Sequence, residues 1–102
     1  MATKAKGDCY EVHAKFITLE LEPGEEKGWL LCHGTIINGF GQTIGHCWLE
    51  HDGRAYDFSN GNSFEFGADE YRQITQARDV QTYEANDVSV NIVRQGHYGP
   101  WP

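Results

Sequence analysis

Ile44-Gly-His-Cys-Trp-Leu-Glu-His-Asp-Gly-Arg-Ala-Tyr-Asp-Phe-Ser-Asn60 is the stretch that decides the fold, because it predicts a β-hairpin. Asp52 and Gly53 are typical of a two-residue type I′ turn, in which both central residues need positive φ. With these residues at the turn, His51 pairs with Arg54 and side chains alternate between the two faces. One face then carries His46, Trp48, Glu50, Ala55, Asp57 and Ser59.

His46 and Asp57 are the two residues of this face that point to chemistry. In this register Asp57 lies diagonal to His46, at a backbone separation of roughly 7 Å that two polar side chains can span. An imidazole and a carboxylate so placed form an oriented acid–base pair. Such a pair needs a nucleophile, which we expect from the N-terminal part of the chain.

Length and composition predict one folded domain over residues 8–102, preceded by a flexible tail at residues 1–7. The formal net charge of −7 argues against a nucleic-acid partner, which a basic patch would attract. No apolar run reaches the ~20 residues of a membrane helix, and the N-terminus lacks the apolar stretch of a signal peptide. The three cysteines are odd in number and well apart, which favours free thiols in a reducing compartment. We therefore expect a cytoplasmic protein.

Hydrophobic periodicity predicts the remaining elements. Residues 9–19 favour a helix, although the alternation at residues 18–21 leaves a strand as the alternative there. The dense apolar run at residues 29–37 predicts a buried strand, and residues 64–66 an aromatic edge or turn. Residues 68–76 and 84–95 favour helices, the second ending at Gly96, and residues 78–83 favour a strand. The expected fold class is α+β: an N-terminal helix on an antiparallel β-sheet of three to five strands, with a C-terminal helix.

Cys9 is the predicted nucleophile, since it falls in the first turn of the expected helix. The positive end of a helix dipole stabilises a thiolate. A nearby imidazole, His46, accepts the thiol proton, and the Asp57 carboxylate holds that imidazole in the productive orientation. The backbone N–H of Cys9 is a candidate for half of an oxyanion hole, with Gln42 or Asn38 as candidate side-chain donors.

Other readings of the cysteines and histidines stay open. Trp48 and His33 are candidates for the site wall, although a buried core histidine is the default for His33. Cys47 alternates with His46 and is expected in the core. His13, four residues after Cys9, is an alternative base. Three cysteines and five histidines also suggest a zinc site, yet no Cys-x-x-Cys or His-x-x-x-His spacing supports one, so no cofactor or metal is expected.

Three motifs carry a resemblance to a known family: Gly7-Asp-Cys-Tyr10, His46-Cys-Trp-Leu-Glu50 and Tyr56-Asp-Phe-Ser59. In this order they resemble the papain-like superfamily, in the style of its transglutaminase-like branch. The chain is also similar to small proteins of bacteriophages and bacteria that share a Leu31-x-His-Gly34 strand and a terminal Gly96-His-Tyr-Gly-Pro-Trp101. The resemblance implies a helix packed on an antiparallel sheet, a Cys9–His46–Asp57 site and, for a phage protein, the host cytoplasm. It does not imply a substrate.

Two functions from different classes follow. The first is a small cysteine hydrolase or acyl-transfer enzyme acting through a thioester on a protein or peptide substrate. Protease, amidase, deamidase and transglutaminase types share this triad and differ in substrate and acceptor. The second is a non-enzymatic, phage-encoded binding or inhibitory protein on the same scaffold, whose acidic surface suits basic partners.

Overall fold

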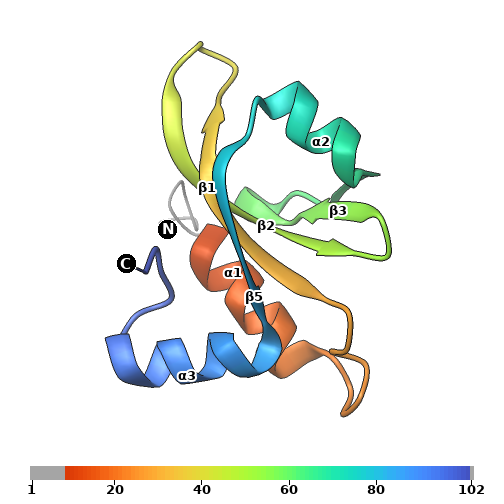
Figure 1. Ribbon diagram of the computed structural model, residues 1–102, viewed down its shortest axis with the longest axis vertical. Helices are drawn as coiled ribbons and strands as arrows, with labels where there is room; N and C mark the ends of the chain where they lie inside the picture. Colours follow the sequence, from red (N-terminus) through yellow and green to blue (C-terminus); the bar gives the residue numbers. More distant parts are fainter. Residues whose placement is uncertain (1–8, 102) are drawn as a thin grey trace.

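A computed structural model describes residues 9–101 (Figure 1). The tail expected at residues 1–7 and the residue before Cys9 lie outside these residues. Five antiparallel strands form one sheet in the order β4-β3-β2-β1-β5. Their bounds are β1 (Leu30–Ile37), β2 (Thr43–His51), β3 (Arg54–Asp57), β4 (Phe64–Gly67) and β5 (Arg78–Glu84). The predicted α+β class with an antiparallel sheet is confirmed.

The β2–β3 hairpin forms in the predicted register. Asp52 and Gly53 have φ of 51° and 78°, the two positive values that a type I′ turn requires. His51 consequently pairs with Arg54, and Glu50 with Ala55. The face that carries Trp48 and Ala55 is the one predicted to hold the acid–base pair.

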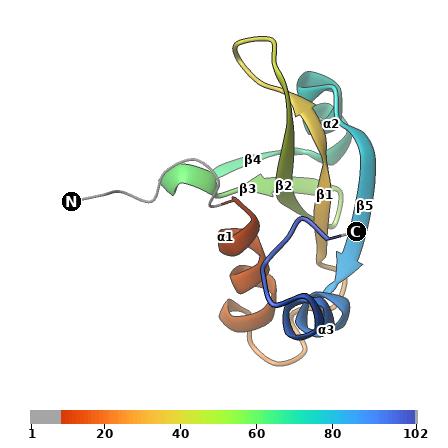
Figure 2. The ribbon, with the colours of Figure 1, turned by 90° about the vertical axis from the view of Figure 1, so that its left-hand side faces the viewer.

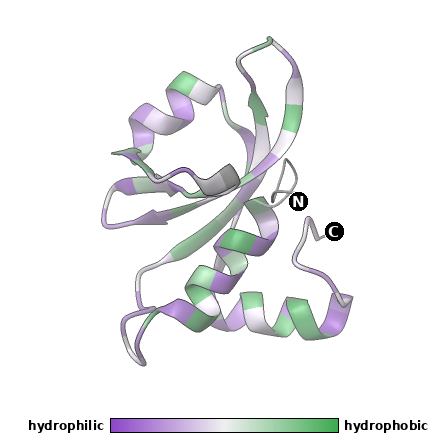
Figure 3. Cartoon of the chain, turned by 180° about the vertical axis from the view of Figure 1, so that it is seen from behind, coloured by the Kyte–Doolittle hydropathy of each residue, from purple (hydrophilic) through white to green (hydrophobic). Residues whose placement is uncertain are grey.

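Helices cover both faces of the sheet (Figure 2). Their bounds are α1 (Cys9–Lys15), which continues as the π-helix η1 (Phe16–Glu20), α2 (Ala68–Thr75) and α3 (Ala85–Gln95); a 3-10 turn, η2 (Ser59–Gly61), follows β3. Ala14 and Ile17 of the α1–η1 helix pack with Leu49 and Val88 on one face. Tyr71 of α2 packs with Trp48 and other residues on the opposite face. Figure 3 shows that α1 and α3 alternate apolar and polar residues along their length, as helices on one side of a sheet do.

The N-terminal helix extends over residues 9–20, close to its predicted length, but its second half is π rather than α. The predicted aromatic edge at residues 64–66 is the edge strand β4. Gly96 ends α3 with φ of 77°, and its N–H bonds to the carbonyl oxygen of Ile92, as predicted for a residue after a helix. Trp101 then packs back on the domain and is 7% exposed. None of the helices within residues 9–101 is long and apolar enough to cross a membrane.

Candidate active site

His46 and Asp57 meet at the point where β2 and β3 separate. The ladder between these strands ends at the Leu49–Tyr56 pair. Beyond it, His46 Nε2 lies 2.9 Å from Asp57 Oδ2. The structure therefore brings together the two residues that the hairpin register predicts to be neighbours.

Four hydrogen bonds converge on the Asp57 carboxylate. Oδ1 accepts from the Ser59 N–H at 3.0 Å and from the Ser59 hydroxyl at 2.6 Å. Oδ2 accepts from His46 and, at 2.9 Å, from the Tyr71 hydroxyl. Burial raises the pKa of Asp57, but the hydrogen bonds from His46 and Ser59 outweigh burial and hold that pKa well below its ordinary value. Asp57 is therefore a fixed negative charge beneath His46.

The His46 imidazole retains a proton at neutral pH. Burial lowers its pKa, since only 13% of the side chain is exposed. Hydrogen bonds to Asp57 and to Cys9 act in the opposite direction and raise the pKa to about 9. The ring thus carries its charge between a carboxylate on one side and a sulfur on the other.

Cys9 is the first residue of α1 and is 6% exposed. A hydrogen bond with the Cys9 thiol is one cause of the raised pKa of His46. Cys9 at the start of α1 and Asp57 at the end of β3 therefore both raise the pKa of His46, which lies between β1 and the β2–β3 split.

His13 has a different place from the one that the sequence suggested for an alternative base. The side chain is fully buried, and its Nε2 accepts the backbone N–H of Phe58 at 2.9 Å. Because Nε2 accepts, the ring proton lies on Nδ1, which donates to the Cys9 carbonyl oxygen at 2.8 Å. Both nitrogens are engaged with backbone, so His13 is a neutral bridge and not a base for the thiol.

Asn38 and Gln42, the candidates for an oxyanion donor, have side chains that bond within their own hairpin loop in this structure. They lie at the tip of the β1–β2 hairpin, where Asn38 Nδ2 donates to Gln42 Oε1 at 3.1 Å. The Asn38 Oδ1 also accepts the backbone N–H groups of Phe40 and Gln42. Gln42 is four residues before His46 on an extended strand, roughly 13 Å away at ~3.3 Å per residue. Figure 1 shows this tip projecting beyond the other elements.

Trp48, one of the two wall candidates, lies beside His46. It is fully buried, and its ring is stacked against His46 with centroids 6.2 Å apart. Its indole N–H donates to Glu50 Oε2 at 2.9 Å, and Arg72 binds both oxygens of the same carboxylate. Glu50 of the His-x-Trp-x-Glu pattern therefore anchors Trp48 and α2 rather than the reacting atoms.

His33, the other wall candidate, lies on the α1 face of the sheet. It pairs with Cys47, whose predicted core position is confirmed by its full burial. His33 is 6% exposed, and neither ring nitrogen has a hydrogen-bond partner among the described residues. The expectation of a core histidine is correct, although His33 contacts aromatic rings instead of polar groups.

Tyr71 and the bridging role of His13 are the site features that sequence reasoning missed. Tyr71 lies in the predicted helix at residues 68–76. The residue that its side chain reaches depends on how α2 docks on the sheet. The spacing of Cys9 and His13, four residues apart on one helical face, was the only signal for the bridge.

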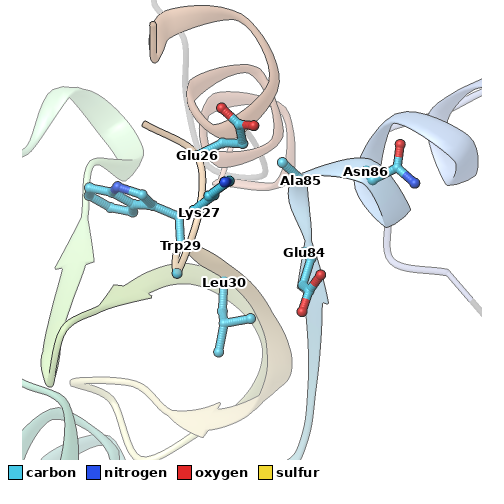
Figure 4. A pocket seen from close by; sticks show the side chains of 8 residues that line it. Glu26, Lys27, Trp29, Leu30, Glu84, Ala85 and Asn86 are labelled. Atoms are coloured by element: carbon cyan, nitrogen blue, oxygen red, sulfur yellow. The ribbon is translucent and has the colours of Figure 1, made fainter. Parts of the chain in front are cut away.

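Within residues 9–101 no group of three His, Cys, Asp or Glu side chains is placed to hold a metal ion. A hollow of about 360 Å³ lies away from the triad, where β1 begins and β5 ends (Figure 4). It is lined by Glu26, Lys27, Gly28, Trp29, Leu30, Glu84, Ala85 and Asn86.

No protein-family model, curated protein or solved structure matches the chain in the three comparisons that were made. The resemblance to the papain-like superfamily therefore stays a prediction, and a functional conclusion has to rest on the geometry of the site.

Proposed function

We propose that the protein is a small cysteine hydrolase or acyl-transfer enzyme with Cys9 as nucleophile. The observation that carries this proposal is the hydrogen bond of His46 Nε2 with Asp57 Oδ2 at 2.9 Å, together with the effect of Cys9, which raises the pKa of the same imidazole. A thiol, an imidazole and an ionised carboxylate in this order are the parts that nucleophilic acyl transfer needs. The motif resemblance to the papain-like superfamily supports the same reading and favours a protein or peptide substrate.

The reaction follows from the positions of the three groups. The proton that the Cys9 thiol gives up is held by His46, and the sulfur attacks the carbonyl carbon of an amide or ester. The carbon–sulfur bond forms as the carbonyl π electrons move to oxygen, where the N–H of the first helical residue is a suitable donor. His46 then gives its proton to the leaving amine or alcohol, and a thioester remains.

Water or an amine completes the cycle. His46 removes a proton from the incoming nucleophile, which attacks the thioester carbonyl, and the Cys9 sulfur leaves as a thiolate and is reprotonated. Hydrolysis gives an acid, and transfer gives a new amide. Asp57 stays ionised throughout, because its four hydrogen bonds stabilise the carboxylate.

A non-enzymatic binding or inhibitory protein is the second candidate, and one observation favours it. Cys9 is only 6% exposed, whereas a nucleophile has to meet its substrate. In this reading the net charge of −7 attracts a basic protein partner, and the triad only holds α1 on the sheet.

Selective alkylation of Cys9 distinguishes the two candidates. Cys32 and Cys47 are internal controls, because both are fully buried and burial raises the pKa of both thiols. We expect iodoacetamide at neutral pH to modify Cys9 first in the folded protein, as read by peptide mass spectrometry. We expect His46→Ala to slow that modification, while all three thiols react alike in urea. Modification of Cys9 no faster than of Cys32 and Cys47 would contradict the enzyme reading.

A further inference from the structure

A hollow of about 290 Å³ opens on the α1 face of the sheet beside the triad. It is lined by Tyr10, His33, Gly34, Thr35, Gly45, Asp79, Gln81, Pro100 and Trp101. Tyr10 directly follows Cys9, and Gly45 directly precedes His46. We propose that this hollow binds the cationic side chain, Lys or Arg, of the substrate residue next to the attacked carbonyl. The inference rests on the proposed function and adds a substrate class to it.

The position of the hollow ties it to the triad. Gly45 belongs to β2 and lies across from Thr35 of β1, one step from the pair of His46 and Gly34. A Cβ added at Gly45 would lie 3.0 Å from the Tyr10 hydroxyl, so the absence of a side chain lets Tyr10 lie close over β2. Tyr10 is the chain neighbour of Cys9 and Gly45 that of His46, so the hollow begins one residue away from two members of the triad.

Aromatic rings form the inner wall. The His33 ring lies 4.9 Å from the ring of Tyr10 and 4.9 Å from that of Trp101, measured between centroids. Trp101 reaches this place because the C-terminal segment runs back past α1 (Figure 2). Such a wall suits the methylene stem of a long side chain and attracts a cation through the ring faces.

Asp79 supplies the charge. It is exposed, and it is the one carboxylate among the nine lining residues, which include no lysine or arginine. Asp79 makes no ion pair with another residue of the described range 9–101. His33 does not oppose a cation, because burial lowers its pKa to about 4 and leaves it neutral. An apolar wall with a carboxylate at its mouth is complementary to an alkyl stem with a positive tip.

The size of the hollow fits one side chain. Pockets for whole small molecules and cofactors span roughly 300–1,000 Å³, so this one is at the lower limit. A glutamate side chain of the substrate would also enter the hollow, but the Asp79 carboxylate would repel its negative charge. An uncharged norleucine would keep the contact with the rings and lose the ion pair.

Peptide chloromethyl ketones that differ only in one residue test the proposal. The Cys9 sulfur forms a thioether with the methylene carbon of the probe, and chloride leaves. Lys, norleucine or Glu is placed first or second from the reactive carbon, and the second-order rate constant of Cys9 modification is read by intact mass. We expect the Lys probe to react about fivefold faster than norleucine, the size that an exposed ion pair gives, and the Glu probe to be slowest.

Two matched variants assign the preference to the hollow. Asp79→Asn is expected to bring the Lys rate down to that of norleucine. Asp87→Asn removes the same charge from the exposed surface of α3 and is expected to leave the Lys preference intact. Equal rates for the three probes, or a Lys preference that survives Asp79→Asn, would overturn the cationic subsite while selective iodoacetamide labelling preserves the enzyme reading. Loss of that selectivity overturns both.

Discussion

The Nε2 atom of His13 accepts the backbone N–H of Phe58 at 2.9 Å, while Nδ1–H donates to the carbonyl oxygen of Cys9. One neutral imidazole therefore connects the first turn of α1 to the residue that follows Asp57. Because Cys9 and Asp57 both act on His46, this bridge, whose Nε2 also lies 4.0 Å from Asp57 Oδ1, fixes the separation between them.

His13→Ala is expected to lower the free energy of unfolding by about 3 kcal/mol, because it opens a cavity and leaves the Phe58 N–H without its partner. It is also expected to slow iodoacetamide modification of Cys9. His13→Gln, whose amide has both a donor and an acceptor, is expected to restore part of each loss. Urea unfolding and alkylation rates measure the two effects. A variant that is destabilised but modified at the wild-type rate would show that the bridge does not position the triad.

Asp57→Asn is expected to lower the pKa of His46 from about 9 towards its ordinary value near 6.5, because the anion that stabilises the imidazolium is lost. Titration of the imidazole signals by NMR measures this shift. Ser59→Ala, which removes one donor to the same carboxylate, is the control and is expected to change the His46 pKa far less. A His46 that still titrates near 9 in Asp57→Asn would contradict the assignment.

Tyr71→Phe is expected to lower the free energy of unfolding by about 1.5–3 kcal/mol, the range for a hydrogen bond to a charged group. The Tyr71 hydroxyl donates to Asp57 Oδ2 and the residue is 5% exposed. Tyr83→Phe is the matched control, since its hydroxyl bonds to Gln81 at the exposed surface, and we expect a change within ~0.5 kcal/mol. Urea denaturation measures the free energy of unfolding of both variants. Equal effects would mean that Tyr71 adds nothing specific to Asp57.

The parts of the site that the sequence predicts are those set by local rules. Asp52 and Gly53 determine the turn type, the turn determines the register, and the register brings His46 close to Asp57. The face assigned to Trp48 and Ala55 follows from the same alternation and is the face that α2 covers. None of these steps needs knowledge of a contact between distant segments.

The parts that the sequence does not predict depend on such contacts. Tyr71 reaches Asp57 because α2 docks on this face, and His13 reaches Phe58 because α1 docks on the other. Asn38 and Gln42 have the right chemistry for an oxyanion donor, but their side chains close their own hairpin loop. Residue type alone cannot distinguish a loop-closing amide from one that faces a substrate.

The proton on His46 makes the stability of the fold fall at alkaline pH. Its folded pKa of about 9 is above the unfolded value near 6.5, so the folded state holds more protons in this range. The contribution, ~3 kcal/mol by this shift, is complete below pH ~6.5 and is lost as pH rises through 9. Urea unfolding at a series of pH values measures this loss. In His46→Gln the free energy of unfolding is expected to fall less steeply between pH 6.5 and 9. The thiols of Cys32 and Cys47 ionise on unfolding in both proteins and contribute equally to both. The same pH dependence of the free energy of unfolding in the two proteins would contradict the prediction.

His33 makes the free energy of unfolding fall at acid pH, whereas His46 makes it fall at alkaline pH. Burial lowers its folded pKa to about 4, below the unfolded value near 6.5, so the unfolded state binds the proton first. The free energy of unfolding is therefore expected to fall by ~3 kcal/mol between pH 6.5 and 4. Asp57, whose folded pKa is lowered, loses its own contribution only at still lower pH. His33→Phe keeps an aromatic ring against Tyr10, Tyr83 and Trp101 and removes the titrating nitrogens. Unfolding of this variant is expected to depend less on pH across that window, with His13 as the buried imidazole that remains, and a slope equal to that of the unmodified protein would exclude His33 as a source.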